Sequence, residues 1–439
     1  MLIGRLGLGL TFFADEWAFI ETRSMGDPGT WFTPHNEHWS TLPVLAYRLL
    51  VETVGIGSYV PYLGLVLALH LVVACLVYLL ARRAAKPAVG LGAGVIVLFL
   101  GSGFENLYWG FQIGFIGSTA AGMAAIAVLE GPPTGRRSAA GITLLVAGLM
   151  TSGIGVMFVV VVGVELLLDR RRRVVTPLLA IPTLIYVVWY ASFGRSGIAT
   201  FRSPFTIDAL LDAPSAIVSG LGNATGATLG VGPIIGGWAG LIGLTIALSW
   251  VTIDIRGPKG ARFLGCMAGI GLQYALIGIL RAQIVQDVTN YTRYTYVSAV
   301  LLLVGASALL GAIWTWDTRT SRRVAMVAGG SLLAMALIWN LRLLVEGRDL
   351  FQARAAMTRA LVINGLERPL PTGVDPERSL VLVPSPASLE RIVGRYGSPV
   401  SDRLVPGFVT TIPPAIATEA HRRLVEGAPI FLPETGVEP

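Results

Sequence analysis

The amino-acid sequence predicts an all-α polytopic membrane protein, and three observations lead to that fold class. Only 13% of its 439 residues are charged, whereas soluble domains carry about 25%. Hydrophobic residues make up 54% of the chain. Many windows of roughly 15 to 22 residues contain no charged residue, which is typical of helices that span a bilayer. The net charge of +7 therefore gives no reason to expect nucleic acid as a partner.

Apolar segments predict a bundle of about 10–11 transmembrane helices. The first segment is too short for a complete span and no cleavage site precedes Asp15, so we expect the second half of a membrane helix there rather than a signal peptide. Cys75 and Cys266 lie inside apolar segments and are expected to be buried free thiols. The predicted segments are 1–13, 60–81, 88–102, 112–129, 138–150, 154–168, 174–193, 233–254, 263–280, 295–316 and 324–345.

Arginine and lysine cluster in five short connections between these segments. The positive-inside rule places such connections in the cytoplasm. Two apolar segments separate each neighbouring pair, so the chain returns to the same side every time. The basic connections are 82–86, 136–137, 170–173, 256–262 and 319–323. The opposite face then receives 14–59, 102–112, 151–153, 194–232, 281–294 and 346–439.

The last part of the sequence, 346–439, is rich in proline, arginine and glutamate. A short apolar run at 379–384 predicts a β-strand. We therefore expect two domains. The first is a transmembrane domain, 1–345, whose first outer loop is 14–59. The second is a small extracytoplasmic C-terminal region, 346–439, built from helix and strand.

The polar first outer loop contains the strongest candidates for chemistry. Asp15 and Glu16 are adjacent carboxylates directly after the first apolar segment, at the expected membrane boundary. One interpretation is structural: Asp15 caps a helix from Glu16 to Met25, because acids are favourable in a first helical turn. The other is catalytic: one carboxylate acts as a general base that accepts a proton from an acceptor hydroxyl.

The same loop carries His35, Glu37, His38 and Trp39. Two histidines and a carboxylate suggest a divalent metal ion, but three ligands so close together in a loop are sterically awkward. We favour hydrogen bonding to a substrate or a structural role. Trp39 is expected either in an interfacial aromatic belt or stacked on a sugar ring.

The second and fourth outer connections contribute one candidate each. Glu105 lies in a turn flanked by glycines, which permit a tight backbone. It belongs either to a simple helix–helix turn or to the same cavity as Asp15. Arg202 lies in 194–232, whose glycine-rich part is expected to be a flexible linker or a segment that closes over a lipid-linked donor.

Arg281 and the pair Arg293–Tyr294 flank the connection 281–294. These arginines depart from the positive-inside pattern, which makes them informative. An arginine at a helix end either extends to lipid headgroups or binds a phosphate through its bidentate fork. We rank Arg293 above Arg281 as a phosphate ligand.

The first outer loop resembles that of the GT-C glycosyltransferases, in the branch of the protein O-mannosyltransferases and the lipid A aminoarabinose transferase. The resemblance covers about 35 residues: Asp15-Glu16, then Gly26 to Pro34 (GDPGTWFTP), then Leu42-Pro43 before the next helix. The Arg-Tyr pair before a late helix is similar too. Ser40 to Pro43 replaces the Lys-Pro-Pro run of the aminoarabinose branch, and the histidine pair is outside the branch's pattern.

This resemblance implies a GT-C-like fold and an enzyme that uses a polyprenyl-phosphate-linked sugar. It implies that Asp15 is the catalytic base and that Glu16 supports it. Envelope glycan, lipid or protein is the expected acceptor, and the outer face of a bacterial plasma membrane is the expected location. A transporter or flippase for a lipid-linked or anionic substrate is the first alternative, and a non-catalytic membrane scaffold is the second.

Overall fold

The computed structural model describes residues 2–197, 206–254, 257–281, 292–313, 319–370, 372–380, 382–400, 402, 404 and 412–426. These residues form helices joined by turns, and their one β-type pairing is an isolated bridge between His35 and His38. The helices, with η for 3-10 turns, are α1 Leu2–Leu6, α2 Asp15–Glu21, α3 Gly29–Phe32, α4 Thr41–Thr53, α5 Val60–Ala84, α6 Pro87–Leu98, η1 Gly101–Gly103, α7 Phe104–Tyr108, η2 Gly110–Gln112, α8 Ile113–Leu129, α9 Gly135–Thr151, α10 Ile154–Leu168, η3 Arg173–Leu179, α11 Ala180–Ser192, η4 Gly194–Ser196, α12 Ile207–Leu229, α13 Pro233–Asp254, α14 Pro258–Arg281, α15 Thr292–Ile313, α16 Arg319–Leu366, α17 Pro386–Tyr396 and α18 Pro414–Glu426.

The chain is an all-α polytopic membrane protein. Within the described residues, six helices are long and apolar enough to cross a membrane, or up to eight if each of two bent pairs is one span. The number is below the 10–11 expected because α9 and α10 have only 17 and 15 residues and the first apolar segment forms a helix of five. A complete span needs about 20 residues.

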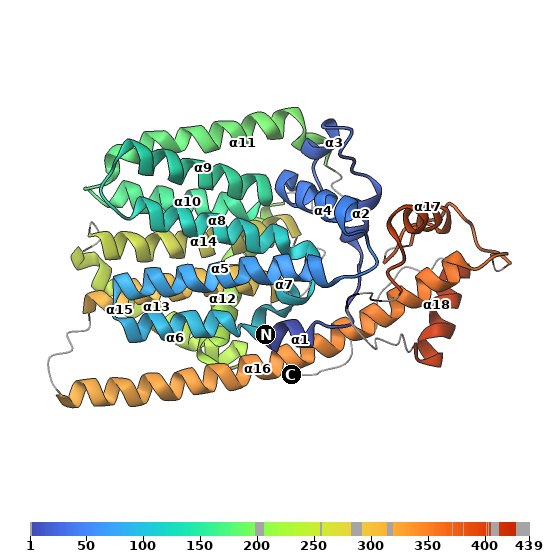
Figure 1. Cartoon of the computed structure of the whole chain (residues 1–439). Helices are drawn as coiled ribbons and strands as arrows, with labels where there is room; N and C mark the ends of the chain where they lie inside the picture. The colour runs from blue at the N-terminus through green and yellow to red at the C-terminus, as the bar shows by residue number, and fades with distance from the viewer. Residues whose placement is uncertain are drawn as a thin grey trace.

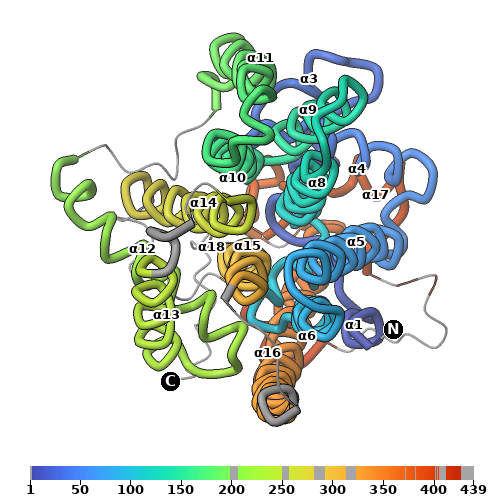
Figure 2. The backbone as a smooth tube through the Cα atoms, turned by 90° about the vertical axis from the view of Figure 1, so that its left-hand side faces the viewer, coloured from blue at the N-terminus to red at the C-terminus, as the bar shows by residue number. Residues whose placement is uncertain are grey.

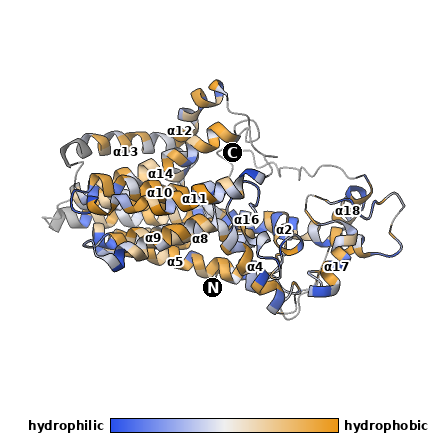
Figure 3. Cartoon of the chain, turned by 90° about the horizontal axis from the view of Figure 1, so that it is seen from above, coloured by the Kyte–Doolittle hydropathy of each residue, from blue (hydrophilic) through white to orange (hydrophobic). Residues whose placement is uncertain are grey.

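The bundle is organised around α15 (Figures 1 and 2). Seen along the bundle, α5, α6, α8, α12 and α14 lie around α15, while α11, α13 and α16 lie at the periphery. The peripheral helices expose large apolar side chains, such as Val188 on α11, Ile242 on α13 and Ile338 on α16. Apolar colour covers much of the bundle in Figure 3. Exposed apolar helix faces of this kind suit contact with lipid.

Three predicted segments differ from the structure. The outer connection 194–232 contains the 23-residue helix α12, which bends by 100° into α13. The boundary expected at 345 falls inside α16, which runs on to Leu366. The strand expected at 379–384 is absent from the described residues there, where the Leu380 N–H donates to the Val383 carbonyl in a turn. A lone strand has no partner to pair with, and Leu382 and Val383 are buried without joining a sheet.

The two cysteines have different environments. Both are free thiols, as expected. Cys266 is buried at the contact of α14 with α15, which confirms the prediction of burial. Cys75 faces outward from α5, so the prediction of burial is wrong there. An apolar helix in a membrane places small soft side chains on either face, because lipid tails are as apolar as a core.

Four of the basic connections meet at one end of the bundle, which we call the basic end. Arg83 at the end of α5 and Arg262 on α14 both contact Glu130 after α8, at 3.1 and 3.3 Å. Lys259 donates to the Gly311 carbonyl of α15 at 2.5 Å. The contacts agree with the expectation that these connections share one side of the membrane.

At the other end, which we call the loop end, the first loop packs against the C-terminal region (Figure 1). The Ala14 N–H donates to the Leu382 carbonyl at 3.2 Å, and the Ile56 N–H donates to the Tyr396 carbonyl at 2.9 Å. Arg359 of α16 donates to the Gly9 carbonyl at 2.7 Å. The C-terminal region therefore fixes the backbone on either side of the acid pair.

Candidate active site

The acid pair begins α2 directly after a strained residue. Ala14 has φ of 50° and ψ of −117°, a region that residues with a side chain rarely adopt. Ala14 occupies the N-cap position, and no side chain caps the helix there. Asp15 is the first helical residue rather than the cap. The capping interpretation of Asp15 is therefore wrong. The sharp turn at Ala14 sends the two carboxylates into different surroundings.

Glu16 is fully buried at the centre of the first loop. Its Oε1 accepts from the hydroxyls of Tyr47 and Tyr59, at 2.5 and 2.9 Å, and its Oε2 accepts from the Phe13 N–H at 2.9 Å. Burial raises the pKa of Glu16 to about 8, against the opposing effect of these donors. A carboxyl with that pKa is mostly protonated at neutral pH, so Glu16 serves to tie α2, α4 and the start of α5 together.

Gly110 makes room for this arrangement. A Cβ at Gly110 would lie 2.6 Å from the Tyr47 hydroxyl and 2.7 Å from Glu16 Oε1. The Gly110 N–H donates to the Tyr59 hydroxyl at 2.6 Å, which leaves the hydroxyl proton to be donated to Glu16. The second outer connection is thus joined to the acid pair through a residue that cannot carry a side chain.

Asp15 lies on the outer side of the loop, with 37% of its side chain exposed. The Nε2 of His35 lies 3.4 Å from its Oδ1. The imidazole is buried between the rings of Phe19 and Phe111, whose centroids are 5.0 and 5.1 Å away. Its Nε2 is buried without a hydrogen-bond partner, so the carboxylate of Asp15 is the polar group that it faces.

The other first-loop candidates have different positions. Glu37 Oε1 lies 3.9 Å from His38 Nε2, and both side chains are partly exposed. Trp39 is buried, with its ring stacked on that of Trp189 at 5.1 Å and its Nε1 bonded to Thr41. Stacking on a sugar is therefore not supported for Trp39, because that ring face is already covered. The described residues contain no group of three His, Cys, Asp or Glu able to hold a metal ion.

Glu105 joins the second outer connection to the start of α15. Its Oε2 accepts from the Thr292 hydroxyl and from the Arg293 N–H, both at 3.1 Å. A carboxylate that accepts from the first N–H groups of a helix is a favourable cap. Next to it, Asn106 donates to the Arg293 carbonyl at 3.0 Å. These bonds position the backbone that carries Arg293.

Arg293 and Tyr294 occupy the first turn of α15. The guanidinium of Arg293 lies over the ring of Tyr294, 5.3 Å from its centroid, and the Tyr294 ring is buried against Phe115. Arg202 and the side chain of Arg281 lie outside the described residues.

The structure adds Arg354 of α16, which the sequence analysis missed. Its guanidinium lies over the rings of Phe13 and Phe351, 5.3 and 4.9 Å from their centroids. The charges of Glu105 and Arg293 both act on it. Its Nε is buried without a hydrogen-bond partner, and no ion pair of the described residues includes it. The sequence signal for this contact was Phe351, because residues three positions apart lie on the same face of a helix.

Aromatic rings connect Arg354 to the acid pair. Phe13 lies two residues before Asp15, and its ring is 5.2 Å from that of Trp109. Trp109 in turn packs 5.1 Å from Phe111, which contacts His35. The loop end thus brings Asp15, His35, Glu105 and Arg293, four of the predicted residues, into one contiguous set with Arg354.

Comparisons with known proteins give one structural likeness. No protein-family model matches the chain, and no curated protein matches it. A crystal structure of the Archaeoglobus fulgidus oligosaccharyltransferase, in complex with Zn and sulfate, is similar with 15% identity and a TM-score of 0.41. The match covers 93% of this chain and 58% of that one, so the chain spans less than two thirds of that enzyme. We therefore argue its function from the residues of the site.

Proposed function

We propose that the chain is a membrane glycosyltransferase that moves a sugar from a polyprenyl-phosphate-linked donor to an acceptor hydroxyl. One observation carries the proposal. A partly exposed carboxylate, Asp15, lies beside a buried histidine, and a ring two residues before it contacts Arg354. A base and a cation at the same end of the molecule suit a reaction in which an acceptor loses a proton while a phosphate departs. The likeness of the first loop to the GT-C enzymes agrees with it.

Asp15 rather than Glu16 is the proposed base. Glu16 is buried, is held by three donors and has its pKa raised to about 8. Asp15 is accessible, and the Nε2 of His35 lies 3.4 Å from its Oδ1. A general base must reach the proton that it removes. Within the pair, only Asp15 meets that requirement.

Arg354 and Arg293 are the proposed ligands of the donor phosphate. The face of a guanidinium stacks on aromatic rings while its edge remains free to donate in a bidentate fork to phosphate oxygens. Arg354 lies over the rings of Phe13 and Phe351, which suits this mode of binding. Glu105 acts as the positioning residue that holds the first turn of α15.

The proposed step is a single inverting displacement. The acceptor oxygen forms a bond to the anomeric carbon while the bond from that carbon to the phosphate oxygen breaks. The proton passes to Asp15, and the electron pair leaves with the lipid phosphate. Because that phosphate is a weak base, cations suffice to stabilise it and no general acid is needed. A glycoside hydrolase, by contrast, uses two carboxylates.

The remaining assignments belong to the same proposal. Glu37, His38 and Tyr294, with Arg202 and Arg281, stay candidate substrate contacts. The proposed displacement has no step that requires a divalent metal ion. The envelope of a bacterium supplies the proposed acceptor, and the loop end faces outward, because the arginines of the basic end favour the cytoplasm.

The test is transfer from a panel of radiolabelled polyprenyl-phosphate sugars by the purified protein, with envelope extract as acceptor. We expect Asp15→Asn to lower transfer about 10²- to 10⁴-fold. Arg354→Ala is expected to lower it about 10- to 100-fold, the range of one charged hydrogen bond. Asp27→Asn is the matched control in the same loop, because its Oδ1 only accepts from the Gly29 N–H. Full activity of a folded Asp15→Asn protein would contradict the assignment.

A transporter or flippase is the second candidate function. An apolar cavity of about 550 Å³ lies between α6, α12, α13, α14, α15 and α16, and α12 bends by 100° into α13. Broken helices beside a cavity are a feature of transporters. The cavity is lined by Ala88, Phe263 and Leu309 among others, toward the basic end and away from Asp15. Movement of a lipid-linked sugar between leaflets without bond cleavage would favour this function.

A further inference from the structure

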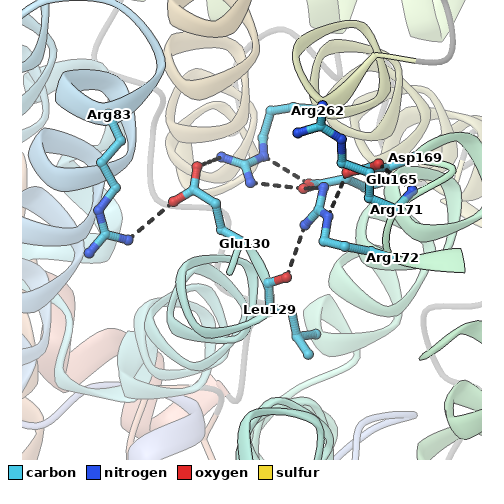
Figure 4. Close-up of polar contacts among 8 residues, drawn as sticks. All are labelled: Arg83, Leu129, Glu130, Glu165, Asp169, Arg171, Arg172 and Arg262. Carbon is cyan, nitrogen blue, oxygen red and sulfur yellow. Dashed lines mark hydrogen bonds and ion pairs between the residues drawn. The ribbon is translucent and has the colours of Figure 1, made fainter. Parts of the chain in front are cut away.

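The basic end contains a second polar cavity, far from the acid pair. It has a volume of about 450 Å³ and is lined from α5, α14, α15 and the connections after α8 and α10. Five cationic side chains line it, with two carboxylates, Glu130 and Asp169. The cations are Arg83, Arg171, Arg172, Lys259 and Arg262. Figure 4 shows the arginines around Glu130, Glu165 and Asp169.

Three of these arginines are already paired. Arg172 contacts Glu165 at 2.6 Å and Asp169 at 2.7 Å. Arg262 contacts Glu165 at 2.8 Å and Glu130 at 3.3 Å. Arg83 contacts Glu130 at 3.1 Å. The pairs form a continuous network, which fixes the three arginines in place before any ligand binds.

Two cations at the cavity have no such pairing. No ion pair of the described residues includes Arg171 or Lys259. Lys259 donates to the Gly311 carbonyl, a neutral group, and the exposed Arg171 uses only its backbone N–H, which donates to Asp169. Even with Glu165 counted, positive charge at the cavity exceeds negative charge by two.

Excess cations around a concave space attract a multivalent anion, because like charges held close together repel one another until a counter-charge enters. The volume is about fifteen times the share of one water molecule in the liquid, so a phosphorylated molecule fits. We propose that this cavity binds a phosphate-bearing anion, either a soluble phosphorylated compound or the headgroup of an anionic lipid. The site is independent of the proposed glycosyl transfer.

The experiment measures binding of radiolabelled pyrophosphate to the full chain in a neutral detergent, by equilibrium dialysis. Arg171→Ala and the double variant with Lys259→Met remove the two unpaired cations. We expect pyrophosphate binding to weaken about tenfold for each cation removed, since one hydrogen bond to a charged group contributes a free energy of that size. Arg173→Ala is the matched control, because it removes an exposed arginine two residues away that does not line the cavity. It is expected to change binding less than twofold.

A second experiment tests whether the phosphate bound in the cavity belongs to a lipid headgroup. The protein is reconstituted in nanodiscs of phosphatidylcholine with a minor share of phosphatidylglycerol, and the lipid retained after detergent extraction is measured. Loss of retained phosphatidylglycerol in the double variant but not in Arg173→Ala supports a lipid headgroup. Absence of both pyrophosphate binding and selective lipid retention overturns the proposal. An equal loss in Arg173→Ala overturns it too, since general surface charge then accounts for the binding. If the double variant does not fold, the binding measured for Arg171→Ala against Arg173→Ala tests the proposal.

Discussion

Glu165 at the basic end and Glu16 at the loop end are both fully buried carboxylates, yet their partners differ in kind. Glu165 is bound by the guanidinium groups of Arg172 and Arg262. Glu16 is bound by two hydroxyls and one amide. Charged partners keep a buried carboxylate ionised, while neutral partners leave its desolvation uncompensated. One end therefore uses buried charge to join helices, and the other keeps a neutral acid that supports an accessible one.

The largest effect expected from this comparison is on stability at the basic end. Glu165→Gln leaves two buried guanidinium groups without their shared counter-charge, a change that typically costs about 3–5 kcal/mol. Glu426→Gln on α18 is the matched control, because it forms an exposed surface pair with Arg422, and such pairs contribute about 0–1 kcal/mol. Thermal unfolding in detergent measures both. Equal shifts in the two variants would mean that the Glu165 network is no stronger than a surface pair.

The second-largest expected effect is on the pH dependence of stability, which should arise from Glu16 at the loop end. Glu16 has its folded pKa raised from 4.5 to about 8. The folded state therefore binds a proton that the unfolded state releases, so this stabilisation is complete below pH 4.5 and is lost as pH rises to about 8. We expect the melting temperature to fall across that window by an amount corresponding to a few kcal/mol. Glu16→Gln should flatten the profile, and Asp27→Asn controls for the loss of an acid from the loop. An unchanged slope in Glu16→Gln would show that the carboxyl is ionised when buried.

The smallest expected change in stability concerns the strained turn before the acid pair. Ala14→Gly relieves a positive φ but adds flexibility to the unfolded chain, so stability should stay within about 1 kcal/mol. Glycosyl transfer should nevertheless fall several-fold, because a more flexible turn holds Asp15 less firmly beside His35. Ala18→Gly on the same helix is a control for added flexibility alone. Transfer unchanged in Ala14→Gly would show that the strain has no role in the reaction.

The sequence predicted the class of fold better than the extent of each helix. Sparse charge was enough to predict membrane helices, and the clusters of arginine predicted which connections meet. The helix α12 was missed because its glycines resemble a linker. Gly220 is in fact required by packing, since a Cβ there would lie 2.2 Å from the Tyr274 ring. That contact depends on tertiary structure, which local composition does not reveal.

The candidate site was predictable only in part for the same reason. Asp15 and Glu16 are equivalent in sequence, and only the turn at Ala14 distinguishes the accessible acid from the buried one. Arg354 was missed because the chain after 345 was assigned to a separate region, although α16 continues through it. Trp39 was expected in an aromatic belt or against a sugar ring, but its stacking partner Trp189 lies 150 positions later in the chain.

The length of α16 sets the height of Arg354 relative to the bilayer. A helix rises about 1.5 Å per residue, so Arg354 lies about 46 Å along the axis from Arg323 at the other end. The hydrocarbon core is about 30 Å thick, and the bilayer with its headgroups about 40–45 Å. If Arg323 lies at one membrane surface, the length of α16 places Arg354 beyond the acyl chains, at the level of the opposite headgroups. A phosphate attached to a membrane-embedded lipid stands at that depth.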